Sequence, residues 1–376
     1  TQGYSSAASD VYKRQHMKRK MSLFVTASMV IASIGSTVPA FASEATLQAS
    51  DYLTAYEMYN GNRENEFYGI STFSVSGLSE DGVKHSAFIE EWKNDLGIEI
   101  HNVESKLVSA EVLDNYDDGA KVWLYEAVTI DYMFPSEGFE RTMEFGTEHI
   151  IKTNNDSGIS ILSDTYSEIT GYETGTEEDL AILYARRESN FSVAEETNVA
   201  STGEIVTTAG YNHSAAVSYA QQYCGSDYFT SGMNVSRYNP SFYYYAGADC
   251  CNFVSQCLVA GGKSMSDSWW ATTTGSTVPL ADTDYSKSGI SWRYVPSFDS
   301  YWQSKGYAKI RITSTSQAGA GNPIFWLKSD GYSTNHVMLI VGASNAENIV
   351  FVNAHNSDCK GYPYRLSDWV MYTFWF

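Results

Sequence analysis

A thiol and a distant imidazole are the groups in this chain best suited to covalent chemistry. Cys250 follows Asp249, a residue type that favours helix N-caps, and opens the run 250–260 before a Gly-Gly pair. A thiol at a helix start gains thiolate character, because the unpaired backbone N–H groups and the helix dipole stabilise negative charge. The same N–H groups can bind the oxyanion of an acyl intermediate. His336 opens a second apolar run, 337–341, so both parts of a cysteine hydrolase are present.

The helix expected from residue 250 has one apolar face. At about 100° per residue, this face is formed by Cys250, Phe253, Val254, Cys257, Leu258 and Gly261. The residues expected to face away are Asn252, Ser255 and Gln256, and Cys251 lies at the edge of the apolar stripe. The alternative is that Cys250 is an ordinary buried cysteine on a core helix.

The histidine run is expected to form a hairpin. A polar turn, 343–348, separates it from a second apolar run, 349–355, and this pattern is typical of two antiparallel strands. If Gly342 pairs with Ile349, His336 lies opposite His355, and Asn353 lies one diagonal step away. Either side chain could then fix the tautomer of a base histidine. A slip of two residues in the register would exchange their roles.

Segment 249–262 resembles a known signature. Its sequence is similar to the Asp-Cys-Thr-Asn-Phe-Val-Ser-Gln run of a bacterial "putative amidase" domain, which looks papain-like and is related to the NlpC-type and CHAP cell-wall hydrolases. The similarity covers residues 211–376 and includes Tyr211-Asn212, Trp292, Phe298, Tyr301, His336-Val337 and Ala354-His355. The resemblance implies that Cys250 is the nucleophile and His336 the general base. It implies that His355 orients the base, with Asn353 as the alternative partner, and that Asp249 and Asn252 play supporting parts.

Three departures from the family pattern bear on these roles. Cys251 stands where the family has threonine, so a second thiol competes for the part of nucleophile. Gly321-Asn322 stands where the family has Gly-Asp, which weakens any role borrowed for that aspartate. His213 stands where the family has arginine.

The N-terminal region has the features of an export signal. Residues 17–42 contain a basic stretch, an apolar core and the cleavage sequence Ala-Phe-Ala, in the style of a Gram-positive secretory signal peptide. We expect cleavage after Ala42, and the alternative is an uncleaved membrane anchor. Residues 1–16 look like an upstream remnant. The mature protein is therefore expected to be secreted or cell-wall associated, without stable membrane insertion.

Charge and cysteine content exclude several classes of function. Residues 43–210 carry 33 acidic and 9 basic residues, whereas residues 211–376 carry ten of each. This chain has no basic stripe, so we do not expect it to bind nucleic acid. No metal-ligand or phosphate-loop motif occurs, and no cofactor is expected.

The odd count of five cysteines suggests a free thiol, although Cys224 and Cys359 could form a disulfide.

Residues 43–171 are expected to form an N-terminal α+β domain. Helical character at 50–60 and 86–96 precedes alternating runs at 105–113, 121–134, 140–153 and 158–167, which predict a curved antiparallel sheet of the NTF2 type. His85, His101 and His149 occur singly there and are interpreted as structural or surface residues. Residues 172–209 are interpreted as a linker that contains a short helix at 178–187.

The sequence as a whole predicts an exported α+β protein of two domains. Residues 210–376 would be a papain-like cysteine amidohydrolase that cleaves amide bonds, with peptidoglycan as the expected substrate, and would fold and act alone. The N-terminal domain would position or target this enzyme. Two other functions remain open, namely a transglutaminase-like acyltransferase and a non-catalytic cell-surface binding module.

Overall fold

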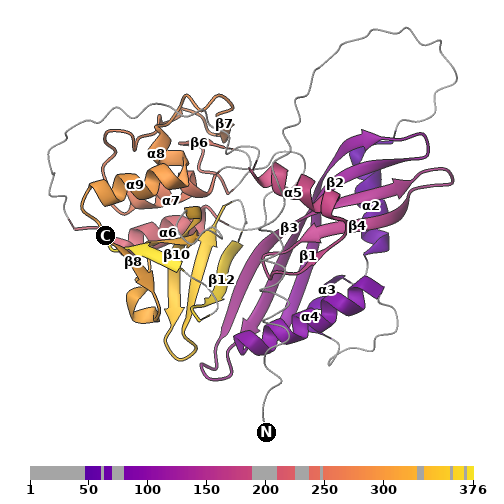
Figure 1. Cartoon of the computed structure of the whole chain (residues 1–376), viewed down its shortest axis with the longest axis horizontal. Helices are drawn as coiled ribbons and strands as arrows, with labels where there is room; N and C mark the ends of the chain where they lie inside the picture. Colours follow the sequence, from indigo (N-terminus) through magenta and orange to yellow (C-terminus); the bar gives the residue numbers. More distant parts are fainter. Residues whose placement is uncertain are drawn as a thin grey trace.

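A computed structural model describes residues 47–60, 63–69, 80–188, 210–224, 237–245, 249–327, 334–355, 359–367 and 371–376. The expected signal peptide, its cleavage site and residues 1–16 lie outside these ranges. None of the described helices is both long and apolar enough to span a bilayer. The described chain is α+β, with one large antiparallel sheet flanked by helices (Figure 1).

The N-terminal unit is built from three helices and a meander of long strands. The helices are α2 (Ala49–Tyr59), α3 (Arg63–Tyr68) and α4 (Glu80–Leu96). The strands are β1 (Glu99–Asn115), β2 (Gly119–Met133), β3 (Glu140–Asn154) and β4 (Ser160–Ser167), each antiparallel to the next. All four strands expected from the alternating pattern are present, and β1 starts six residues earlier than predicted.

The segment interpreted as a linker is folded in its first half. β5 (Glu173–Thr174) pairs with β4, and α5 (Glu177–Glu188) follows it. Asp179 on α5 forms buried ion pairs with Lys121 at 2.9 Å and Lys152 at 2.7 Å, which tie the helix to β2 and β3. Residues 173–188 therefore belong to the N-terminal unit, and the rest of the predicted linker, 189–209, lies outside the described residues.

The C-terminal unit places helices over one face of its strands. The helices are α6 (His213–Gln222), α7 (Cys250–Ala260), α8 (Ile290–Arg293), α9 (Val295–Ser304) and the short 3-10 helix η2 (Thr315–Gln317). The strands are β8 (Lys309–Ile312), β9 (Pro323–Leu327), β10 (Thr334–Ser344), β11 (Ile349–Ala354), β12 (Cys359–Arg365) and β13 (Met371–Phe374). A separate parallel pair is formed by β6 (Tyr243–Tyr244) and β7 (Leu280–Ala281).

The two units share one sheet. Its main path runs β1-β2-β3-β12-β11-β10-β9-β13-β8, with β4 also paired to β3. The joint consists of β12 beside β3, where Cys359 pairs with Phe145 and Lys360 pairs with Glu144. Figure 1 shows this joint as the yellow strand β12 next to the magenta strand β3.

A hydrophobic core also crosses the joint. One buried cluster combines residues of α3 and α4, among them Phe67 and Ile89, with Phe145 of β3, Met338 of β10 and Val350 of β11. The indole of Trp92 on α4 lies 6.4 Å from the ring of Tyr362 on β12, between ring centroids. Arg365 of β12 donates from Nη2 to the carbonyl oxygen of Leu96 at 2.7 Å. These contacts argue against the expectation that residues 210–376 fold alone, because removing the N-terminal unit would expose this apolar face.

Candidate active site

Helix α7 carries the predicted nucleophile and is buried on every side over its first nine residues. The polar residues expected to lie away from the apolar stripe are bonded to neighbouring side chains. Trp292 donates from its indole to Asn252 at 2.5 Å, and Trp269 donates to the hydroxyl of Ser255 at 2.9 Å. Tyr219 donates its hydroxyl to Gln256 at 2.5 Å. These bonds let α7 bury amide and hydroxyl groups at little cost.

Cys250 lies at the first position of α7 and is fully buried. The backbone N–H of Val337 on β10 lies near enough to the sulfur to lower its pKa, as do the N–H groups of Cys250 and Cys251 at the helix start. Burial raises the pKa of the Cys250 thiol to about 12, although these three N–H groups lower it. The negative charge of Asp249 raises the pKa further. The expected thiolate character at the helix start is thus outweighed by desolvation.

His336 directly precedes Val337 and is buried. The effect of the Val337 N–H on the Cys250 thiol therefore places the thiol near the backbone that follows this histidine. Val337 and Leu339 pack in the core around α7, whereas Met338 and Ile340 pack in the core on the other side. A register shift against β9 lies between Thr334 and His336, so the regular alternation of the strand is interrupted at the histidine.

The expected hairpin is present, but its register differs from the predicted one. β10 and β11 are antiparallel, and Gly342 pairs with Phe351 rather than with Ile349. A bulge between Ile340 and Gly342 then shifts the pairing by one residue, so that Leu339 faces Asn353. Continuing this register would place position 337, not position 336, beside position 355. The predicted direct opposition of the two histidines is therefore wrong, since a one-residue shift moves side chains to opposite faces.

His355 contacts the start of the cysteine helix. Its Nδ1 lies 2.6 Å from Oδ2 of Asp249, and its Nε2 lies 2.7 Å from the carbonyl oxygen of Tyr223. A carbonyl oxygen only accepts, so Nε2 is the donor in the contact with Tyr223. The imidazole also stacks on Phe253, with ring centroids 4.1 Å apart. His355 thus orients Asp249, the residue directly before Cys250.

Asp249 does not cap α7 with its side chain. Its Oδ1 accepts from the backbone N–H of Tyr245 at 2.8 Å and from the amide of Asn252 at 2.7 Å, while Oδ2 faces His355. Asn252 also donates to the carbonyl oxygen of Tyr243 at 3.0 Å. Both predicted supporting residues therefore fix the loop that leads into α7.

Asn353 has a different role from the one predicted. Its amide donates to the carbonyl oxygen of Ala220 on α6 at 3.0 Å, and its Oδ1 accepts from the N–H of Gly361 on β12 at 2.8 Å. The side chain is completely buried and bridges α6, β11 and β12. These contacts make Asn353 a structural link.

The remaining cysteines are buried free thiols. All five cysteines fall within the described ranges, and none forms a disulfide. The sulfur of Cys224 instead donates to the carbonyl oxygens of Ala354 at 3.4 Å and Cys359 at 3.0 Å. Burial raises the pKa of Cys251 well above its ordinary value. Among the described residues, no group of three or more His, Cys, Asp or Glu side chains could hold a metal ion.

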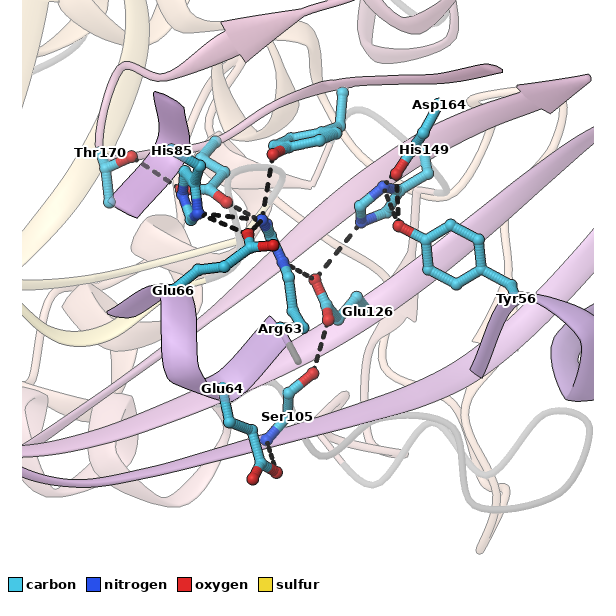
Figure 2. Close-up of polar contacts among 12 residues, drawn as sticks. Tyr56, Arg63, Glu64, Glu66, His85, Ser105, Glu126, His149, Asp164 and Thr170 are labelled. Carbon is cyan, nitrogen blue, oxygen red and sulfur yellow. Dashed lines mark hydrogen bonds and ion pairs between the residues drawn. The ribbon is translucent and has the colours of Figure 1, made fainter. Parts of the chain in front are cut away.

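A second polar cluster, in the N-terminal unit, was not expected from the sequence. Arg63 of α3 forms buried ion pairs with Glu66 at 3.0 Å, with Glu126 at 3.1 Å and with Glu168. His85 lies 2.8 Å from Glu66 and 3.1 Å from Glu168. Figure 2 shows Arg63 at the centre of this network, with the side chains of His85, Glu66 and Glu126 around it.

His149 extends the network toward α2. It lies 3.1 Å from Asp164 and 3.4 Å from Glu126, and the hydroxyl of Tyr56 lies 3.0 Å from its Nδ1. Burial alone would lower the pKa of His149, but Asp164 and Glu126 raise it to about 9. Burial alone would raise the pKa of Glu126, but Arg63 and His149 lower it to about 2. The sequence feature that could have indicated this network is Glu126 within the apolar run 122–128 of β2.

Comparison with known proteins shows what the C-terminal unit is similar to. The chain is 25% identical over 252 residues to the uncharacterized protein YhbB of Bacillus subtilis (strain 168), an alignment that covers 65% of this chain and 66% of that relative. The chain thus spans just under two thirds of that relative's length. No solved structure matches this chain significantly. Residues 210–376, which contain Cys250, His336 and His355, match the family described as "Putative amidase domain".

Proposed function

We propose that residues 210–376 form a papain-like cysteine amidase that hydrolyses amide bonds through a thioester. The observation that carries this proposal is the position of the Cys250 sulfur. It lies at the start of α7, where the backbone N–H of Val337, the residue after His336, is near enough to act on its pKa. The family match over the same residues supports amide hydrolysis as the reaction.

The proposed reaction follows from these groups. Because burial keeps the thiol protonated at neutral pH, a base has to remove its proton as the sulfur attacks the substrate carbonyl carbon. His336 accepts that proton, and the N–H groups at the start of α7 stabilise the oxyanion. Collapse of the intermediate breaks the C–N bond, and the amine leaves with the proton from His336. Water then hydrolyses the thioester, which releases the acid and restores the thiol.

His355 acts in this scheme as a positioning residue. Its contact with Asp249 fixes the residue before the nucleophile, whereas its other nitrogen is held by Tyr223. Asn353 supports the same region from α6 and β12. Loss of either side chain is expected to reduce activity less than loss of Cys250 or His336.

We further propose that the substrate is peptidoglycan and that the mature protein acts outside the cell. The sequence of residues 17–42 supports export. The curved sheet β1–β4 with its helices supports an NTF2-like unit that places the amidase on the cell wall. No cofactor and no nucleic acid enter the proposed reaction.

One observation favours a second candidate, a non-catalytic binding module. The thiol of Cys250 is fully buried and its pKa is raised to about 12, which is typical of an unreactive structural cysteine. The rate of thiol alkylation near neutral pH separates the candidates. Rapid modification of one cysteine, lost in Cys250→Ala, supports the enzyme, whereas uniformly slow modification supports the binding module.

The decisive experiment is mass spectrometry of purified peptidoglycan after incubation with the mature protein. New amine and carboxyl termini are expected and would identify the bond. Cys250→Ala and His336→Ala should each reduce turnover at least about a thousandfold, because nucleophile and base act as a unit. Cys251→Ala, the matched control from the next position of α7, should keep most of the activity. Equal activity of Cys250→Ala and the unmodified protein would contradict the proposal, and crosslinked products with an added amine would indicate acyl transfer instead.

A further inference from the structure

Arg293 is the last residue of α8, which packs against the first turns of the cysteine helix α7. The indole of Trp292, its direct neighbour, donates to Asn252 at 2.5 Å, and the hydroxyl of Ser255 donates to the carbonyl oxygen of Trp292 at 2.9 Å. Burial raises the pKa of the Cys251 thiol, and the positive charge of Arg293 is one of the influences that lower it. Arg293 therefore lies close to the start of α7, although the reaction proposed above does not use it.

The guanidinium of Arg293 is held in place by neutral groups. Its Nη1 donates to the carbonyl oxygen of Ser288, and its central carbon lies 5.4 Å from the ring centroid of Tyr285. The ring of Tyr285 stacks on that of Tyr245 with centroids 5.8 Å apart, and the hydroxyl of Tyr245 lies 2.6 Å from that of Ser288. A backbone carbonyl and an aromatic ring thus fix the side chain without neutralising its charge.

The same guanidinium has hydrogen-bond donors that no protein group uses. Within the residues that the structure describes, Arg293 forms no ion pair and no further hydrogen bond. Its Nε is enclosed, whereas Nη2 is not, and the side chain is only partly buried. Nη2 carries two N–H groups. A molecule that approaches from solvent can therefore reach a positively charged donor beside the start of α7.

The surroundings of Arg293 favour a singly charged anion. A guanidinium with unused donors binds carboxylate or phosphate, the anions that match its geometry. Asp282 is buried in the same region, since burial raises the pKa of Tyr285, Arg293 lowers it and Asp282 raises it further. Asp249 adds another negative charge at the start of α7. A doubly charged phosphate would meet stronger repulsion from these two aspartates than a carboxylate would.

We propose that Arg293 binds a free carboxylate of the substrate, close to the amide bond that Cys250 attacks. This inference rests on the proposed function, because it assigns a substrate class to the same site. The substrate is then a peptide with an acidic group near the bond that is broken. Nη2 donates to the carboxylate, and the contacts with Ser288 and Tyr285 keep the guanidinium in position before the substrate arrives.

Binding is measured by titration calorimetry on the full chain carrying Cys250→Ala, which removes turnover from the measurement. The probes are soluble muropeptides from purified peptidoglycan. One sample is intact, and in the other the carboxylates are converted to carboxamides with carbodiimide and ammonia. Intact muropeptides should bind about tenfold to a hundredfold more tightly than amidated ones, the range that corresponds to hydrogen bonds with a charged group.

Three variants in this background assign the preference to one side chain. Arg293→Met should bind intact muropeptides about as weakly as amidated ones. Arg293→Lys keeps the charge without the planar guanidinium and should retain a several-fold preference, which separates loss of the donor from loss of the fold. Arg311→Met, at an exposed arginine on β8, is the matched control and should keep the full preference.

The results that would overturn the inference differ from those that would overturn the amidase. Equal binding of intact and amidated muropeptides, no binding of either, or an unchanged preference in Arg293→Met would each contradict carboxylate binding by Arg293. Displacement of intact muropeptides by inorganic phosphate, at concentrations where acetate has no effect, would contradict it too. Hydrolysis by the unmodified chain is measured separately. A carboxylate preference that disappears in Arg293→Met, without any turnover by the unmodified chain, would support the binding site and contradict the amidase.

Discussion

The buried histidine of the N-terminal network should make stability fall on the alkaline side. The pKa of His149 is raised from 6.5 to about 9, because Asp164 and Glu126 outweigh the effect of burial. A raised pKa contributes stability that is fully present below pH 6.5 and is lost as the pH rises through about 9. This difference corresponds to roughly 3 kcal/mol. The pKa of Glu126 is lowered first by Arg63 and then by His149, and because the His149–Glu126 pair contributes to both shifts, the two are not added.

The test compares the unmodified chain with His149→Gln, which cannot titrate. Urea unfolding followed by tryptophan fluorescence gives the free energy of unfolding at a series of pH values. The free energy of unfolding of the unmodified chain should exceed that of the variant, and this difference should decrease by roughly 3 kcal/mol between pH 6 and pH 10. The control is His101→Gln, at an exposed histidine paired with Glu140 at 3.1 Å. Its free energy of unfolding should change with pH as that of the unmodified chain does. Parallel curves for His149→Gln as well would show that this histidine is not a buried cation in the folded protein.

Three further predictions concern the joint and its supports. A fragment of residues 210–376 should aggregate or remain unfolded, because the core across β3 and β12 loses its N-terminal half. Circular dichroism and gel filtration test this. A monomeric fragment that unfolds cooperatively would refute the prediction. Gly361→Ala should cost about 2–4 kcal/mol in urea unfolding, since φ is +64° and the new Cβ would lie 2.8 Å from the carbonyl oxygen of Thr142. Gly138→Ala, at φ +71° with open space around it, should cost only about 1 kcal/mol, and equal losses would mean that the close approach is not the cause. Asn353→Ala should lower the free energy of unfolding by about 2–4 kcal/mol, because two buried backbone groups lose their partner; a neutral effect would contradict the bridging role.

Local patterns predicted the elements of this protein well. The meander β1–β4 followed from alternating runs between turn residues, and α7 and the hairpin β10–β11 followed from apolar periodicity. These features depend on neighbours within a few residues, which the sequence displays directly.

The register and the burial of polar groups could not be predicted in the same way. The pairing of Gly342 with Phe351 and the bulge between Ile340 and Gly342 leave no mark in the apolar pattern, yet together they remove the predicted opposition of His336 and His355. The burial of Asn252 depends on Trp292, forty residues further along the chain. The ion network around Arg63 joins residues from α3, α4 and three strands. Each of these arrangements is decided by tertiary contacts.

The joint between β3 and β12 has a consequence for how the chain matures. Phe145 of β3 pairs with Cys359 of β12, which is synthesised more than 200 residues later. This part of the β3 edge is paired only once β12 has been made. At typical rates of synthesis, about 10–40 s separate the appearance of the two strands. During that interval β3 presents an open edge, the kind of surface that recruits other chains into mixed sheets. Correct folding therefore depends on preventing the N-terminal unit from associating with other molecules of this chain until β12 has been synthesised.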